Sequence, residues 1–262
     1  MTNKLTYLFF VILLTGIGHA QFDIDNQIKL DVDSVSIVAL YDSVNFCSYL
    51  TVTTNDNKEL LKEECIERIS SLKAEDLDAD GKKEILIETY TGGAHCCTSL
   101  FIARIKDKKF NYLDTIYWGN CSYFIEDLNN DGKKEIIGRN DMFAYFFTNF
   151  SMSRFPVQIY NLRKNRLKLV NSEFTSTIYK NINDLKEELK LYKKSGFECP
   201  KNDSADVFNT DAGAVQAILA AITADYYYID ETEKGYEYID KVYTCPDKKK
   251  FVKILKNEFK LK

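Results

Sequence analysis

The sequence predicts a mainly β protein with α-helices at its C-terminal end, built as an open array of antiparallel, blade-like sheets followed by a helical subdomain. Three observations support this fold class. Short apolar and β-branched runs alternate with polar turns from residue 28 to about residue 178, which is typical of antiparallel sheets. A twelve-residue segment occurs twice in this region, which indicates a duplicated unit. After residue 179, apolar residues recur at the spacing of a helical face.

The expected strands are short runs bounded by turn residues. Each repeat keeps one order along the chain: an acidic loop, a strand, an irregular stretch, a second strand, a charged turn and a third strand. The charged turns are residues 106–109 and 163–166. The runs are Val35–Leu40, Phe46–Val52, Leu60–Cys65, Ile85–Thr89, Leu100–Ile105, Phe110–Tyr117, Tyr123–Ile125 and Val157–Tyr160.

Three helices are expected in the C-terminal part. The first is capped by Asn181 or Asn183 and ends at Gly196, because the apolar residues between them lie on one helical face. A second begins near Thr210 or Asp211, and a third begins near Pro246, a residue that suits the first turn of a helix. We therefore predict a β-repeat domain over residues 21–178 and a helical region over residues 179–262.

The repeated segment carries the pattern of a metal-binding loop. EDLDADGKKEIL (residues 75–86) and EDLNNDGKKEII (residues 126–137) are identical at nine of twelve positions. A hard divalent cation such as Ca²⁺ takes six to eight oxygen ligands, and side chains at the first, third and fifth positions of a tight loop converge on it, commonly with a main-chain carbonyl. We expect Ca²⁺ to be bound by Asp76, Asp78, Asp80, Lys82 (main chain) and Glu84, and by Asp127, Asn129, Asp131, Lys133 (main chain) and Glu135.

These loops differ from the EF-hand, which needs a glutamate at its twelfth position. Here the twelfth positions are Ile87 and Gly138, and the glutamate stands at the ninth position, directly before a strand-like run. The first loop offers four carboxylates and the second offers three, so the first is expected to bind calcium more strongly. The alternative is a solvated acidic turn, since Asp, Asn and Gly also favour turns without a metal.

In these residues the chain resembles the FG-GAP/VCBS repeat family, whose D-x-D/N-x-D-G-x-x-D loops lead into a strand and whose units often assemble as β-propeller blades. The resemblance is strong in the two loops and weak in the strands around them, over residues 73–170. It implies a calcium-binding repeat protein. At roughly fifty residues per unit the β region holds about three units, fewer than the four to eight blades of a closed propeller. A partial or open β-propeller-like array is therefore expected.

The N-terminal segment has the features of a signal peptide. Lys4 precedes an apolar run from Leu8 to Leu14, and small residues at Gly18 and Ala20 suit cleavage after Ala20. We therefore expect a secreted or periplasmic protein, and no later apolar run is long enough for a membrane span. The formal net charge of −4 and the absence of a basic stripe argue against a nucleic-acid partner.

Export to an oxidising compartment favours disulfides among the seven cysteines. Cys47 and Cys65 are equidistant from Asp56, at the centre of a turn-like segment, so they are expected to pair across a hairpin. Cys199 and Cys245 flank the helical region, where a disulfide would join its ends. This leaves an odd set of three, Cys96, Cys97 and Cys121, in which one thiol stays free or pairs elsewhere. Sequence does not choose among the connectivities, and the expectation preferred here is that one of the adjacent cysteines pairs with Cys121.

Function is expected to be binding rather than catalysis, with an exported protein or a surface glycan as partner. The alternative is a thiol-dependent enzyme, a hydrolase or redox protein, centred on His95 and Cys97. A cysteine–histidine nucleophile needs the two side chains within hydrogen-bond reach, and zinc needs three or four converging ligands. Neighbouring residues of a strand point to opposite faces, so Cys96 and Cys97 are expected to diverge. A purely structural role is the remaining possibility.

Overall fold

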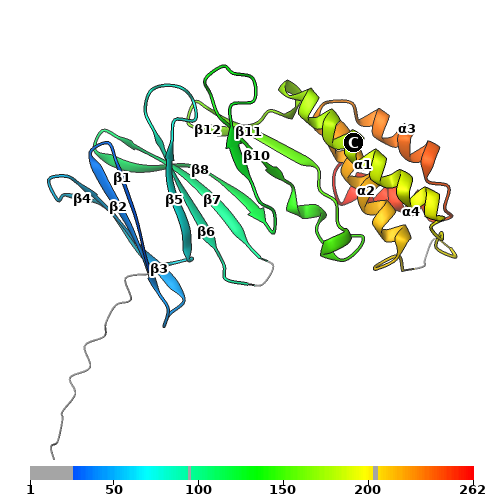
Figure 1. The fold of residues 1–262 in the computed structure, drawn as a ribbon, viewed down its shortest axis with the longest axis horizontal. Helices are drawn as coiled ribbons and strands as arrows, with labels where there is room; N and C mark the ends of the chain where they lie inside the picture. Colours follow the sequence, from blue (N-terminus) through cyan, green and yellow to red (C-terminus); the bar gives the residue numbers. More distant parts are fainter. Residues whose placement is uncertain (1–25, 94–95, 203–205) are drawn as a thin grey trace, which may run out of the picture.

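The computed structural model describes residues 26–93, 96–202 and 206–262. Within these residues the strands form three four-stranded sheets, and in each sheet the strands pair in chain order as an antiparallel meander. The sheets follow one another along the molecule and the helices lie at the far end (Figure 1). The predicted fold class is therefore confirmed, as an open array with no closed barrel among the described residues. The predicted signal peptide lies outside them.

Most of the strands lie where the apolar runs predict them. Each predicted run overlaps a described strand, whereas the first strands of the first and second sheets were not predicted. The first sheet contains β1 (Gln27–Val32), β2 (Val35–Asp42), β3 (Cys47–Thr54) and β4 (Glu59–Ile66); the second, β5 (Ile69–Glu75), β6 (Glu84–Tyr90), β7 (Thr98–Lys106) and β8 (Lys109–Gly119); the third, β9 (Phe124–Glu126), β10 (Glu135–Arg139), β11 (Val157–Arg163) and β12 (Arg166–Leu169).

The sheets are stacked, and each interface between them holds its own apolar core. Successive strand residues point to opposite faces, so Ile85 and Ile87 of β6 pack against the first sheet while Leu86 packs toward the third. In β10, Ile136 joins the core shared with the second sheet, and Ile137 joins the core shared with the helices. The apolar runs after the two acidic loops are thus continuous because both of their faces are buried.

Among the described residues, four α-helices form a layer that packs on the outer side of the third sheet: α1 (Thr175–Ser195), α2 (Asp211–Tyr228), α3 (Thr232–Val242) and α4 (Lys248–Asn257). The predicted ends at Gly196 and Thr210 are confirmed. Gly196 closes α1 in the left-handed conformation, and the Thr210 side chain accepts a hydrogen bond from the main chain of Gly213. Helix α2 is buried along nearly its whole length, which makes it the centre of the helical layer.

Two helix predictions are wrong. Helix α1 begins at Thr175, so neither Asn181 nor Asn183 caps it, and the domain boundary predicted after residue 178 falls inside this helix. Asn181 is instead a buried helix residue that hydrogen-bonds Asp225 of α2. Helix α3 is not among the three predicted helices; it is short and contains Gly235 in its interior, a residue that weakens the sequence signal of a helix.

Two of the predicted disulfides are present. Cys47 and Cys65 join β3 to β4 with their Cα atoms 4.8 Å apart. Cys199 and Cys245 join the segment after α1 to the segment before α4, with their Cα atoms 5.3 Å apart. The second disulfide closes a loop that contains α2 and α3, so it holds the central helix in place.

Candidate functional site

The first acidic loop joins β5 to β6 and is closed by its own side chains. The Asp76 carboxylate accepts hydrogen bonds from the main-chain nitrogens of Asp80 (3.2 Å) and Gly81 (2.9 Å). The Asp80 carboxylate accepts one from the nitrogen of Lys82 at 2.8 Å. Gly81 has φ of 80°, a conformation that favours glycine. The oxygens therefore turn toward the inside of the loop, while the Lys82 side chain is exposed.

The second loop, between β9 and β10, has the same hydrogen bonds. The Asp127 carboxylate accepts from the nitrogens of Asp131 (3.2 Å) and Gly132 (2.9 Å), and the Asp131 carboxylate accepts from Lys133 (2.9 Å). Asn129 also accepts a hydrogen bond from the Asp131 nitrogen, at 3.1 Å. Burial acts to raise the pKa of Asp127, but these main-chain hydrogen bonds outweigh it and lower that pKa. The duplicated sequence thus folds into duplicated geometry.

The ninth-position glutamates are the buried members of the two sites. Glu84 is 0% exposed and Glu135 is 1% exposed. Glu84 accepts a hydrogen bond from the nitrogen of Leu77 at 2.9 Å, and Glu135 accepts one from Leu128 at 3.1 Å. Each glutamate therefore ties the start of its loop to the start of the following strand. Burial raises the pKa of Glu84, and hydrogen bonds from Leu77 and Arg104 oppose this rise only in part.

The two loops lie beside each other, although they belong to different sheets. The main-chain nitrogen of Lys134 donates to the carbonyl of Leu77 at 3.1 Å. The ammonium of Lys134 also pairs with Glu75, with 2.6 Å between Nζ and Oε2. The two loops are therefore joined by one main-chain hydrogen bond and one ion pair.

The donor groups of both loops are oxygens, the ligands that Ca²⁺ and Mg²⁺ prefer. Among the described residues, one ligand oxygen each from Asp76, Asp78 and Glu84 lie within 4.8 Å of one another. Oδ1 of Asp78 is buried and has no hydrogen-bond partner. The second loop cannot offer three neighbouring carboxylates in the same positions, because Asn129 stands where the first loop has Asp78. An amide oxygen is nevertheless also a ligand for calcium.

A functional residue that sequence reasoning missed is Arg104 of β7. Its guanidinium reaches into the first loop and donates to Asp78 (3.0 Å), to Asp80 (3.1 Å) and to Glu84. Arg104 lies twenty residues after Glu84 in the chain, so the loop motif does not include it. The pairing of Ile85 with Ala103 puts Arg104 opposite Glu84, so the only signal was the strand register.

The structure corrects the predicted arrangement of the cysteines near His95. His95 lies outside the described residues. The sulfur atoms of Cys96 and Cys97 are joined to each other rather than diverging, and the Tyr117 hydroxyl donates to Cys97 at 2.7 Å. Cys121 is buried and unpaired, so its expected pairing with one of these cysteines is wrong. Burial, followed by the nearby Asp141 carboxylate, raises the pKa of the Cys121 thiol to about 12, which keeps it a poor nucleophile.

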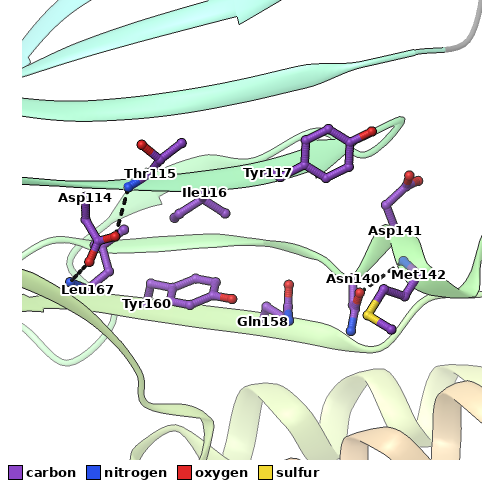
Figure 2. Close-up of a pocket in the computed structure, with 10 residues that line it drawn as sticks. All are labelled: Asp114, Thr115, Ile116, Tyr117, Asn140, Asp141, Met142, Gln158, Tyr160 and Leu167. Atoms are coloured by element: carbon purple, nitrogen blue, oxygen red, sulfur yellow. Dashed lines mark hydrogen bonds between the residues drawn. The ribbon is translucent and has the colours of Figure 1, made fainter. Parts of the chain in front are cut away.

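A pocket of about 450 Å³ lies between β8 and the third sheet. Figure 2 shows residues 115–117 of β8 along one wall, Gln158 and Tyr160 of β11 along the opposite wall, and Asp141 and Met142 at one end. At the other end the Asp114 carboxylate accepts a hydrogen bond from the nitrogen of Leu167 at 3.0 Å. Burial raises the pKa of Tyr160 to about 12, so its phenol stays neutral. The lining therefore combines tyrosine rings with amides and carboxylates.

Comparison with known proteins finds one distant similarity. Over 178 residues the chain is 28% identical to a probable thylakoid lumen protein of Synechocystis sp., a match that covers 67% of this chain and 48% of that protein. The match thus spans about half the length of the relative. No family model matches the chain. No solved structure matches it. Among the described helices, none combines the length and apolar character that a membrane crossing requires.

Proposed function

We propose that this chain is an exported calcium-binding β-repeat protein that acts as a binding module. The observation that carries the proposal is the pair of acidic loops, which share their sequence and their hydrogen bonds. Carboxylates gathered in one loop repel each other, and a divalent cation offsets that repulsion. Bound calcium would be held by Asp127, Asn129, Asp131 and Glu135, or by their counterparts in the first loop. It would supply charge neutralisation and fix each loop to the following strand.

Two further observations support export. The disulfides of β3–β4 and of the helical region favour an oxidising compartment. The similar Synechocystis protein is described as a probable thylakoid lumen protein. A secreted or periplasmic location is consistent with both, because disulfides persist in those compartments.

The test of calcium binding is equilibrium dialysis of chelator-treated protein against calcium. The control is the double variant Glu84→Gln and Glu135→Gln, which removes one carboxylate from each loop and keeps the side-chain shapes. Wild-type protein is expected to retain calcium, and the double variant is expected to bind it more weakly. A wild type that retains no calcium at millimolar concentration would reject the calcium part of the proposal.

The pocket between β8 and β11 is the proposed ligand site, and a surface glycan is the partner that its lining favours. Sugars present hydroxyls to amides and carboxylates and present C–H faces to aromatic rings. Asn140, Gln158 and Asp141 supply the polar groups, and Tyr117 and Tyr160 supply the rings. A pocket with a few converging polar groups is the usual form of a small-ligand site.

The test of the ligand site is a glycan array followed by titration of any glycan that binds. Tyr117→Ala is expected to weaken binding at least tenfold, because Tyr117 is exposed at the pocket. Tyr145→Ala serves as the control, since Tyr145 is also exposed but lies outside the pocket lining. Equal glycan binding by both variants would show that the pocket is not the site. Capture of an exported protein that Tyr117→Ala leaves unchanged would favour the protein partner instead.

A further inference from the structure

The first loop already contains a cation, which is the guanidinium of Arg104. Its side chain is 11% exposed and contacts three of the four carboxylates of the loop. Nη1 of Arg104 also lies 3.4 Å from the Asn165 amide oxygen, in the turn between β11 and β12. Hydrogen bonds between a guanidinium and carboxylates are charge-assisted and strong. Three of the four carboxylates that a metal would need are therefore already bound by a side chain, and Oδ1 of Asp78 is the buried oxygen that has no hydrogen-bond partner.

The second loop has no such residue at the corresponding position. Ile136 of β10 pairs with Tyr160 of β11, which puts Asn161 opposite Glu135, as Arg104 is opposite Glu84. Asn161 donates from its amide nitrogen to Glu135 at 2.7 Å. The repeat thus carries arginine in one copy and asparagine in the other, at the one position that faces the buried glutamate. The interior of the first loop therefore contains a positive charge that the interior of the second loop lacks.

The other cations near the second loop are engaged elsewhere or held at a distance. Lys133 approaches Asp131 only to 4.0 Å, and both side chains are more than two-fifths exposed. Arg163 lies beside Asn161, with Nε 3.2 Å from the amide oxygen, but both of its terminal nitrogens bind Glu173. Neither cation occupies the loop as Arg104 occupies the first one.

We propose that Arg104 takes the place of the metal ion in the first loop, so that calcium binds in the second loop alone. This inference rests on the proposed calcium function and specifies which repeat performs it. The guanidinium and a calcium ion need the same carboxylates, those of Asp78, Asp80 and Glu84, and two cations in one loop repel each other, so binding one excludes the other. It reverses the expectation from charge count, in which the first loop was the stronger site. The second sheet would then fold without calcium, whereas the third sheet would depend on it.

The test is the number of calcium ions bound per chain, measured by isothermal titration calorimetry after chelator treatment. Arg104→Asn gives the first loop the residue that the second loop has, and Asn161→Arg makes the reciprocal change. The wild type is expected to bind one calcium ion, Arg104→Asn two, and Asn161→Arg none. Arg104→Asn should be purified in calcium, because its carboxylates lack a cation without it. Circular dichroism in calcium shows whether each variant is folded.

A second pair of variants leaves Arg104 in place and therefore tests the inference even if Arg104→Asn does not fold. Asp76→Asn alters the first loop at a residue that Arg104 does not contact, and Asp127→Asn is the same change in the second loop. Asp76→Asn is expected to keep the wild-type stoichiometry, and Asp127→Asn is expected to lose binding. Loss of calcium in Asp76→Asn, or two ions in the wild type, would overturn the inference.

The results also separate this inference from the proposed function. If the wild type binds one ion and the folded Arg104→Asn variant still binds one, the role of Arg104 is rejected while the calcium function stands. If the wild type binds none but Arg104→Asn gains one ion, Arg104 does occupy the place of a metal, and the calcium function of the natural chain is rejected.

Discussion

The carboxylate of Asp225 in α2 accepts a hydrogen bond from the main-chain nitrogen of Val157 in β11 at 2.8 Å. This places an ionisable group in the core between the third sheet and the helices. The amide of Asn181 donates to the same carboxylate at 2.5 Å, and Arg139 in turn donates to Asn181 at 2.6 Å. Burial raises the pKa of Asp225 to about 7, although these hydrogen bonds and the charge of Arg139 oppose the rise.

Stability is therefore expected to depend on pH through Asp225. In the unfolded chain the pKa of an aspartate is about 3.9, so between about pH 4 and pH 7 the folded state holds a proton that the unfolded state has lost. The contribution of Asp225 to the free energy of unfolding therefore falls as pH rises through this window and is constant above it. The total fall is on the order of a few kcal/mol, because each unit of pKa difference between the folded and unfolded states corresponds to about 1.4 kcal/mol.

Urea unfolding at a series of pH values checks this prediction. Asp225→Asn should remove this fall. The wild type is therefore expected to lose stability relative to the variant as pH rises from 4.5 to 7.5. The control is Asp230→Asn, which removes an exposed carboxyl nearby. An Asp225→Asn profile parallel to that of the wild type would rule out this residue as the source.

Removal of the Cys199–Cys245 disulfide is expected to destabilise the helical region. The bridge spans 46 residues, whereas the Cys47–Cys65 bridge spans 18. In the chain-entropy account a longer closed loop gives a larger effect, about 4 kcal/mol against about 3 kcal/mol here. Paired Cys→Ser variants, unfolded in urea, compare the two bridges. If removal of the Cys47–Cys65 bridge lowered the free energy of unfolding more than removal of the Cys199–Cys245 bridge, packing in the folded state would be the dominant cause.

Gly138 and Trp118 are expected to be energetically coupled. A Cβ atom on Gly138 would lie 2.3 Å from the Trp118 ring, which is fully buried in the core between the second and third sheets. Gly138→Ala should therefore cost about 1–3 kcal/mol through overpacking. In a Trp118→Leu background the added cost should be smaller, and a double-mutant cycle followed by circular dichroism measures the difference. Additive effects would contradict the predicted contact.

Much of the fold was predictable because the loops and strands have local signals. The apolar residues that follow each acidic loop identified the buried strands, and Gly196 and Thr210 identified helix ends. Strand β5 was missed because of a register shift between Ile69 and Ser71. The bulge puts Ile69 and Leu72, three residues apart, on the buried side, so the two-residue period is broken.

The site was predictable only in its local part. The loop ligands follow one another in the sequence, so their convergence could be read from spacing. The role of Arg104 depends instead on the register between β6 and β7, which is set by a connection that carries no clear pattern. Asn161 depends in the same way on the long connection between β10 and β11. Cross-strand neighbours of this kind decide the charge of each loop, and sequence spacing does not reveal them.

Thermal unfolding with and without calcium tests the account most directly. An ion that binds only the folded state stabilises it by about 2.7 kcal/mol at a hundred times its dissociation constant, which corresponds to a rise of roughly 5–10 °C in Tm for a chain of this size. Millimolar calcium should raise the Tm of chelator-treated wild type and of Asp76→Asn, and should leave the Tm of Asp127→Asn nearly unchanged. Identical melting curves for the wild type in calcium and in chelator would contradict the account.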